Sequence, residues 1–191
     1  TEPGLLRNVA LPATLPDPPA SFSGPSRVCV GCHSPTSSTL RPEASAAAIV
    51  AGRGGLDPET GAPIALAPVH GIDKKGCLSC HNSGPESLER GRGHAFVATL
   101  SSCTPCHAQT PRRNADVSAR ALALFAQLDS KPPTPGAGRP QHASEALVVN
   151  TPQKTRALRN LLLVLEDPAA DVHHPAYANA LLDSAERLTL G

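Results

Sequence analysis

The chain of 191 residues has few aromatic side chains: three Phe, one Tyr and no Trp. Aromatic residues normally supply much of the buried area of a core, and the 21 Pro and 15 Gly residues interrupt regular elements. We therefore expect a mostly irregular fold with a few α-helices and no significant sheet. Something other than ordinary side-chain packing is expected to organise it.

The sequence also lacks long basic runs and long apolar runs. Its formal net charge is +1, and basic stretches such as PRRN and DKKG are only two residues deep, so we expect no nucleic-acid partner. The apolar run LLLVL at 161–165 is too short to cross a bilayer, so we expect no transmembrane segment. The sequence begins at Thr1 without an apolar leader, and we expect a mature, secreted chain whose signal peptide has been removed.

All six cysteines lie in three copies of one pattern, Cys-x-x-Cys-His. The first motif is CVGCH at 29–33, the second is CLSCH at 77–81 and the third is CTPCH at 103–107. On a helical turn, positions i, i+3 and i+4 share one face. Two thiols can then reach the vinyl groups along one edge of a haem while the imidazole binds the iron. This spacing is the attachment signature of c-type haem, and the sequence predicts three covalently bound haem c groups.

Two other uses of the cysteines fit the pattern less well. Three disulfides suit a secreted chain, but they do not require a His after each second Cys. Zinc usually joins two Cys-x-x-Cys pairs in one site, so three pairs leave one over. We predict thioether bonds at Cys29, Cys32, Cys77, Cys80, Cys103 and Cys106, and proximal iron ligands at His33, His81 and His107.

Three large apolar macrocycles would compensate for the missing aromatic side chains, because burial of apolar area is the main favourable term in folding. Thioether bonds would also restrict the unfolded chain, much as disulfides do. We therefore expect that the chain does not fold without haem.

The second axial ligand of each iron is expected to be histidine. The sequence has no Met, which excludes the His/Met coordination that raises the potential of haem. Five further histidines are available: His70, His94, His142, His173 and His174. This supply favours bis-histidine iron of low potential with no open position for a substrate, so we predict that the protein is not an enzyme.

The positions of these histidines suggest which haem each one serves. His70 lies seven residues before Cys77, and His94 lies nine residues before Cys103. A histidine shortly upstream of one motif is well placed to bind the iron of the preceding haem. We predict that His70 serves the first motif and His94 the second.

The remaining candidates are less distinct. His173 and His174 are adjacent, so both are not expected to bind one iron; we favour His173 for the third motif, with His174 as the alternative. His142 follows the Pro/Gly-rich stretch KPPTPGAGRPQ. It is either an exposed histidine or a ligand across a subunit boundary.

Four segments are expected along the chain. Residues 1–26 form a Pro-rich extended arm that is a candidate subunit contact, and residues 27–130 carry the three haem motifs. Residues 131–141 form a Pro/Gly linker. Residues 142–191 form a helical segment that packs on haem and supplies a distal His.

Helical periodicity marks several elements within these segments. A short helix is expected in RPEASAAAIVAG, ended by Gly52, and 53–69 are expected to form a loop. Longer helices are expected in NADVSARALALFAQL, in TPQKTRALRNLLLVLEDP with Thr151 as N-cap, and after Pro175. The faces expected to pack are Val117, Ala121, Leu124 and Leu128; Leu158, Leu161, Leu162 and Leu165; and Tyr177, Leu181, Ala185 and Leu188.

With His70 and His94 upstream of the second and third motifs, the chain resembles the multihaem c-type cytochromes, particularly extracellular ones of metal-respiring bacteria. The ending DVHHPAYANALLDSAERL is similar to the G-V-H-N-P…Y…LL…A tail of large bacterial multihaem cytochromes, with His173 in the ligand position and His174 where Asn is usual. The resemblance covers residues 29–107 and 171–188. It implies a haem-organised multihaem cytochrome c fold.

The resemblance also implies electron transfer through closely spaced bis-histidine haems, in a protein that is extracellular or at the cell surface. Some members of the group polymerise into filaments with a continuous chain of haems, and in several a subunit supplies a histidine to its neighbour. The expected partners are redox proteins or an extracellular electron acceptor, and further copies of this chain. The three motifs here are fewer than in the best-known filament formers. The alternatives are a monomeric periplasmic shuttle and a multihaem reductase with an open iron site, against which the surplus of histidines argues.

Overall fold

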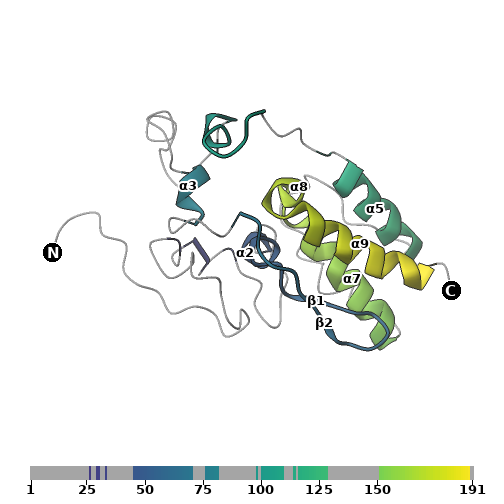
Figure 1. Ribbon diagram of the computed structural model, residues 1–191. Helices are drawn as coiled ribbons and strands as arrows, with labels where there is room; N and C mark the ends of the chain where they lie inside the picture. Colours follow the sequence, from purple (N-terminus) through teal and green to yellow (C-terminus); the bar gives the residue numbers. More distant parts are fainter. Residues whose placement is uncertain are drawn as a thin grey trace.

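The computed structural model consists of helices joined by irregular chain and one small hairpin (Figure 1). In chain order the elements are α2 (Ala46–Ala51), β1 (Gly55–Leu56), β2 (Pro63–Ile64), α3 (Leu78–His81), the 3-10 helix η2 (Leu100–Ser102), α5 (Asp116–Leu128), α7 (Pro152–Leu165), α8 (Ala170–His173) and α9 (Pro175–Thr189). The residues described are 26, 29–30, 33, 45–70, 76–81, 98, 100–109, 114, 116–128 and 151–189. Across them the fold is mostly helical and irregular, which confirms the predicted class at this level. The predicted linker, and the predicted arm apart from Ser26, lie outside the described residues.

Helices α5, α7 and α9 pack against one another and enclose the main apolar core (Figure 1). The faces predicted from helical periodicity are the buried ones, with two positions at the edge of the core. Buried residues are Val117, Ala121, Leu124 and Leu128 of α5, Leu158, Leu161 and Leu162 of α7, and Tyr177, Leu181 and Ala185 of α9; Leu165 and Leu188 are partly buried. The bundle therefore has a conventional core of its own, made mostly of aliphatic side chains.

The ends of the helices follow the local sequence. The side chain of Thr151 accepts a hydrogen bond from the amide of Lys154 at 3.2 Å, and α7 and α9 both begin at a proline. Proline suits a first turn because the amide that it lacks has no partner there in any case. Helix α2 ends at Gly52, whose φ of 63° is the left-handed conformation typical of a helix C-cap.

The segment 53–69, expected to be a loop, contains the hairpin of β1 and β2. The strands are antiparallel, with Gly55 opposite Ile64 and Leu56 opposite Pro63. Two residues per strand are too few to produce the alternation by which a strand is recognised in a sequence. Within the part of the chain that the structure describes, the expectation of no significant sheet is confirmed, while residues 53–69 contain a hairpin that was not predicted.

A buried amide fixes β1 to the bundle. Asn160 of α7 accepts a hydrogen bond from the amide of Leu56 at 3.0 Å and donates one to the carbonyl of Leu56 at 2.7 Å. The same side-chain amide donates to the hydroxyl of Ser184 on α9 at 2.9 Å. The polar groups of Asn160 are thus satisfied although the residue is buried.

A second buried polar group, the hydroxyl of Tyr177 on α9, holds both strands. It accepts a hydrogen bond from the amide of Gly55 at 2.8 Å and donates to the carbonyl of Ile64 at 3.2 Å. Burial raises the pKa of Tyr177 to about 12. A Cβ at residue 55 would lie 2.2 Å from Cδ2 of Leu181, so the strand can approach α9 this closely only as glycine.

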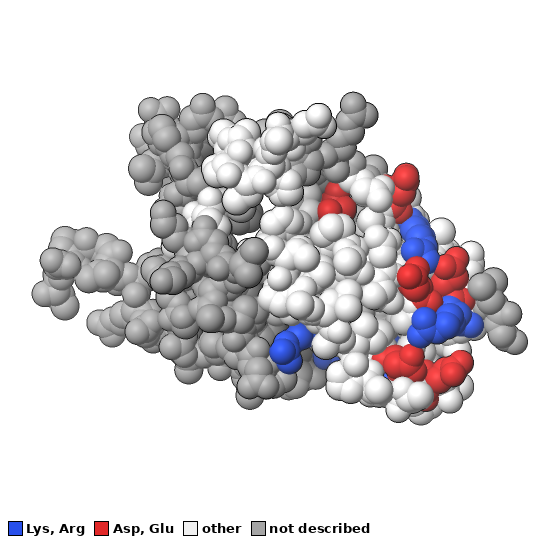
Figure 2. Space-filling model, in the orientation of Figure 1, with Lys and Arg blue, Asp and Glu red and all other residues white. Residues whose placement is uncertain are grey.

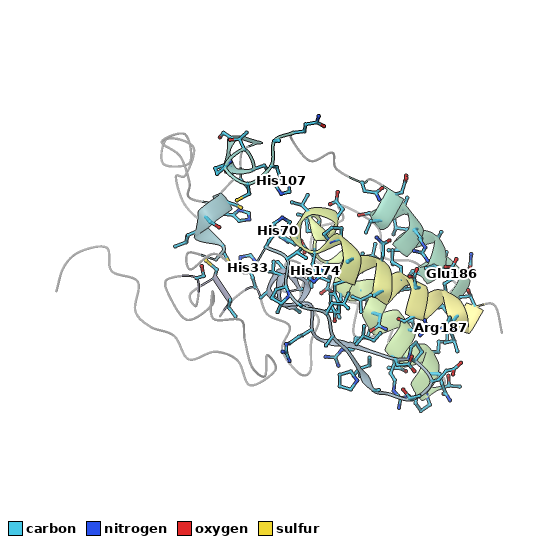
Figure 3. All side chains as sticks on the ribbon, in the orientation of Figure 1. His33, His70, His107, His174, Glu186 and Arg187 are labelled. Atoms are coloured by element: carbon cyan, nitrogen blue, oxygen red, sulfur yellow. The ribbon has the colours of Figure 1, made fainter. Side chains whose placement is uncertain are left out.

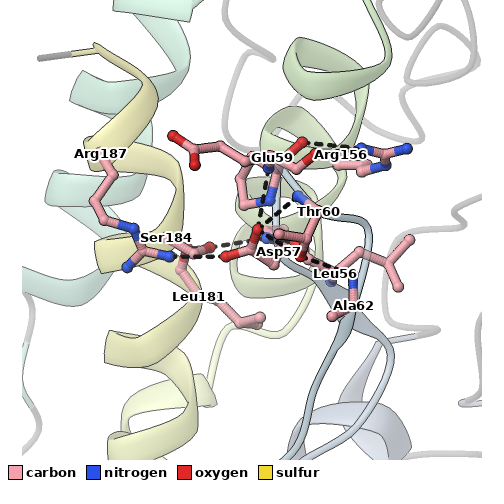
Figure 4. Close-up of polar contacts among 11 residues, drawn as sticks. Leu56, Asp57, Glu59, Thr60, Ala62, Arg156, Leu181, Ser184 and Arg187 are labelled. Carbon is pink, nitrogen blue, oxygen red and sulfur yellow. Dashed lines mark hydrogen bonds and ion pairs between the residues drawn. The ribbon is translucent and has the colours of Figure 1, made fainter. Parts of the chain in front are cut away.

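Side chains from the first half of α7 and from the C-terminal end of α9 contact the turn of the hairpin (Figure 4). Asp57 Oδ1 accepts hydrogen bonds from the amide and hydroxyl of Thr60, each at 2.9 Å, and Asp57 Oδ2 accepts from Arg187 of α9 at 3.1 Å. The hydrogen bonds from Thr60 are the main cause of the lowered pKa of Asp57. Arg156 of α7 donates to the carbonyl of Pro58 at 3.0 Å.

The surface of the described residues is unevenly charged. On the face drawn in Figure 2, most acidic and basic side chains gather at the end of the bundle where α9 and the hairpin turn lie, while the surface toward the haem motifs is largely uncharged. No helix among the described residues has both the length and the apolar character needed to cross a membrane.

Candidate functional site

Each haem motif closes one helical turn with the same hydrogen bond. The amide of the motif His donates to the carbonyl of the first Cys, four residues earlier. The N···O distances are 2.8 Å from His33 to Cys29, 3.0 Å from His81 to Cys77 and 2.9 Å from His107 to Cys103. The predicted turn therefore forms in all three motifs, and it brings the first Cys and the His to one side of the backbone.

The three motifs lie close to one another. The thiol of Cys77 hydrogen-bonds to Cys29, which lowers the pKa of Cys29 and, together with burial, raises that of Cys77. The hydroxyl of Ser102, just before the third motif, donates to the carbonyl of Cys80 at 3.0 Å.

None of the five described cysteines is fully buried. Cys29, Cys77, Cys80 and Cys103 are partly buried and Cys106 is exposed, and none of these five is in a disulfide. Cys32 lies outside the described residues.

Two motif histidines each face a second histidine. The ring centres of His70 and His107 are 6.1 Å apart with a tilt of 48° between the rings. Those of His81 and His173 are also 6.1 Å apart, with a tilt of 53°. Figure 3 shows His33, His70, His107 and His174 gathered between α3 and the end of the bundle where α8 lies.

This spacing fits two ligands of one metal. Imidazoles on opposite sides of a metal ion, with metal–nitrogen bonds of about 2.0 Å, have ring centres about 6 Å apart. A haem iron needs only two ligands from the protein, because the porphyrin supplies the other four nitrogens. Among the described residues no three of His, Cys, Asp and Glu are grouped to hold a bare metal ion, whereas histidines meet in pairs.

Hydrogen bonds determine which ring nitrogen each distal histidine presents. Nδ1 of His70 lies 3.1 Å from the carbonyl oxygen of His173, and Nδ1 of His173 lies 2.7 Å from Oδ2 of Asp167. Both partners can only accept, so each Nδ1 carries the proton. The lone pair on each ring is then on Nε2, the atom available to bind a metal.

The hairpin and α8 position these two rings. The chain after β2 lies against α2, where Leu66 donates to the carbonyl of Gly52 at 3.0 Å. A Cβ at residue 52 would be 2.3 Å from the carbonyl oxygen of Leu66, so glycine is needed for this approach. Helix α8, which packs on α2, carries His173 at its end.

His174 is a buried structural residue. Its Nε2 lies 2.9 Å from the carbonyl oxygen of Ala67, and its Nδ1 accepts a hydrogen bond from the amide of Tyr177 at 3.2 Å. Its exposed fraction is 1% and burial lowers its pKa, which favours the neutral ring. Both nitrogens of His174 are used within the protein, whereas the ring of His173 lies beside that of a motif histidine, His81.

The motif histidines that lie beside His70 and His173 are not those of the motifs to which the sequence assigned them. His70, predicted for the first motif, lies beside His107 of the third. His173, predicted for the third motif, lies beside His81 of the second. The hairpin and the bundle bring together residues that are distant in the sequence, so the order of motifs does not give the order of neighbours. His94 and His142 lie outside the described residues.

Two buried carboxyl groups near this site were missed in the sequence. Asp167, 1% exposed, holds His173. Glu166, the C-cap of α7, has no hydrogen-bond partner among the described residues for either carboxyl oxygen, and burial raises its pKa to about 8. The only available signal was an acidic pair between the apolar α7 and the tail that contains His173.

No family model, curated protein or solved structure matches this chain. The function is therefore inferred from the motifs and from the geometry of the histidines. The uncommon feature to be explained is a set of three identical turns next to two histidine pairs.

Proposed function

We propose that the protein is a triheme c-type cytochrome that transfers electrons through closely spaced bis-histidine haems. The cysteines of the three motifs would form the thioether bonds, and His33, His81 and His107 would be the proximal ligands. His173 would complete the iron at His81, and His70 would complete the iron at His107. His94 and His142 are the candidates for the iron at His33.

The observation that carries this proposal is the pairing of motif histidines with distal histidines at 6.1 Å. On each of these distal rings a hydrogen bond at Nδ1 leaves Nε2 as the nitrogen that can bind iron, which supports the proposal. Zinc or disulfide chemistry at the cysteines would leave these pairs without a role.

Bis-histidine haem supplies one-electron transfer at low potential. The residues of the chain determine how the groups are held. Asp167 and the carbonyl of His173 fix the two distal rings, while the hairpin and α8 fix the backbone behind them. Because both axial positions would be filled by histidine, the chain offers no position at these irons for a substrate, and an electron carrier is favoured over a reductase.

The cellular setting follows from the resemblance alone. We propose a secreted protein, extracellular or at the cell surface, that exchanges electrons with redox proteins or an extracellular acceptor and assembles into a homopolymeric, haem-wired filament. The alternative is a monomeric periplasmic shuttle. Negative-stain microscopy of native material distinguishes them, since filaments support the first setting and dispersed particles the second.

The haem content is tested by intact mass after expression with the c-type maturation machinery. We expect the mass of the chain plus three haems. Replacing both cysteines of any one motif by Ala should remove one haem and leave two. A wild-type chain with no covalent haem would refute the proposal.

The axial pairing is tested by combining substitutions. His173→Ala should convert one low-spin haem to a form that binds carbon monoxide when reduced, and His174→Gln is the matched control that should bind none. The effect of His70→Ala should disappear in a Cys103→Ala/Cys106→Ala background and persist in a Cys29→Ala/Cys32→Ala background. The opposite pattern would assign His70 to the iron of the first motif.

A further inference from the structure

The two distal histidines differ in what accepts the proton on Nδ1. For His70 the acceptor is a neutral carbonyl oxygen, that of His173, at 3.1 Å. For His173 it is the carboxylate of Asp167, at the shorter distance of 2.7 Å. Hydrogen bonds to a carboxylate are shorter and stronger than those between neutral groups, so the two sites are not equivalent.

Asp167 is held rigidly for this contact. Its side chain is 1% exposed, and its Oδ1 accepts a hydrogen bond from the amide of Ala169 at 3.1 Å. The carbonyl of Asp167 accepts from the amide of Ala170, the first residue of α8, at 3.0 Å. One carboxylate oxygen is thus occupied by the backbone, and the other is directed at His173.

A buried carboxylate on Nδ1 makes an imidazole a stronger electron donor through Nε2. Stronger donation, together with a nearby negative charge in a medium of low dielectric constant, favours ferric over ferrous iron. A neutral carbonyl at the equivalent position has a smaller effect. The difference therefore acts on the haem bound by His173 and much less on the haem bound by His70.

On the basis of the proposed function, we infer that Asp167 is a positioning residue that lowers the reduction potential of the haem at Cys77/Cys80 below that of the haem at Cys103/Cys106. An electron shared by these two haems then resides mainly on the haem at Cys103/Cys106. Electron transfer between them is therefore favoured from the second motif toward the third.

The test is a spectroelectrochemical titration of the holoprotein carrying Asp167→Asn. Asparagine keeps an oxygen that can accept from Nδ1 of His173 but removes the charge. We expect three low-spin haems, with one potential raised by about 59 mV, which is a tenfold change in the equilibrium constant of a one-electron couple. The other two potentials should stay within the error of the titration.

Two variants make this result specific. Asp183→Asn removes a carboxylate that is 59% exposed on α9, and it should leave all three potentials unchanged. Asp167→Glu keeps the charge, and the potential of the haem at Cys77/Cys80 should stay close to that of the wild type. In a Cys77→Ala/Cys80→Ala background, Asp167→Asn should have no effect on the two potentials that remain.

Unchanged potentials in Asp167→Asn would overturn the inference, and so would an equal shift in Asp183→Asn. If Asp167→Asn instead releases His173 from the iron and gives one high-spin haem, Asp167→Glu decides. A low-spin haem at Cys77/Cys80 with its wild-type potential supports the role of the charge. A raised potential of that haem overturns it. A wild-type chain without covalent haem would refute the proposed function itself. Three bis-histidine haems that are insensitive to Asp167 would refute only this inference.

Discussion

The bundle and the haem-motif side of the molecule are held together in different ways. In the bundle, Leu158, Leu161 and Phe125 are almost completely excluded from solvent. On the motif side no residue of α3 is buried, and apart from Val30, which is fully buried, the contacts described there are mainly hydrogen bonds and histidine pairs. The comparison indicates two kinds of packing: the bundle is held by a buried apolar core, and beside it His173 and His70 lie next to motif histidines.

The comparison also changes the expectation that the chain cannot fold without haem. That expectation followed from the scarcity of aromatic residues, but α5, α7 and α9 build a core from aliphatic side chains. We now expect dependence on haem to be confined to the motif side. The predictions below test this division, beginning with the largest change.

Replacing all six cysteines by Ala should remove every haem absorption band yet leave most of the far-ultraviolet circular dichroism of α5, α7 and α9. The reason is that most buried residues of the core come from these helices, and Val30 is the one buried apolar residue that the described part of the motifs adds to it. A spectrum of unfolded chain would contradict the division and would show that haem organises the whole molecule.

Leu161→Ala should lower the free energy of unfolding of the holoprotein by about 2–5 kcal/mol, the cost of a cavity in a packed core. Leu78→Ala, a matched change in α3 where the side chain is only partly buried, should cost less than about 0.5 kcal/mol. Chemical denaturation measures both. Equal losses would show that α3 is packed as tightly as the bundle.

Glu166→Gln should remove a pH dependence of stability. The pKa of Glu166 is about 8 in the folded chain against an ordinary value of 4.5, so the folded state retains a proton that the unfolded chain releases. Stability therefore falls as pH rises from about 4.5 to about 8 and then levels off. The variant should be more stable than the wild type at pH 8 by up to about 4 kcal/mol, at about 1.4 kcal/mol for each unit of the raised pKa, and equal to it at pH 4.

The control for this prediction is Glu59→Gln, because Glu59 is exposed on the hairpin turn. Its stability should follow the wild-type pH profile. Parallel profiles for the wild type and Glu166→Gln would mean that Glu166 is not a buried neutral acid.

Arg120→Ala should have the smallest effect. Arg120 of α5 forms ion pairs with Asp183 and Glu186 of α9, and these groups are partly exposed. We expect a loss of about 0.5–1 kcal/mol that disappears in 1 M salt. A larger loss that salt does not reduce would mean that packing of the Arg120 side chain, rather than its charge, joins the two helices.

The helices were predictable because their apolar residues recur at helical spacing, as in the buried face of α5 from Val117 to Leu128. The hairpin was not, since two residues per strand leave no pattern. The choice of His173 over His174 could be favoured but not decided, because it depends on Ala67 and on the amide of Tyr177. Proximity of His70 to His107 depends on the path of the chain after β2, which local sequence does not encode.

Residue 173 contributes to two sites at once: its ring lies beside that of His81, and its carbonyl oxygen accepts a hydrogen bond from Nδ1 of His70. The two sites are therefore not separable modules. A designer who wished to transplant one of them to another scaffold would have to carry α8, the chain after β2 and both histidine pairs together. By the same reasoning, a change of the backbone near residue 173 must preserve both sites. Fewer substitutions are therefore acceptable there than the side chain of residue 173 alone would require.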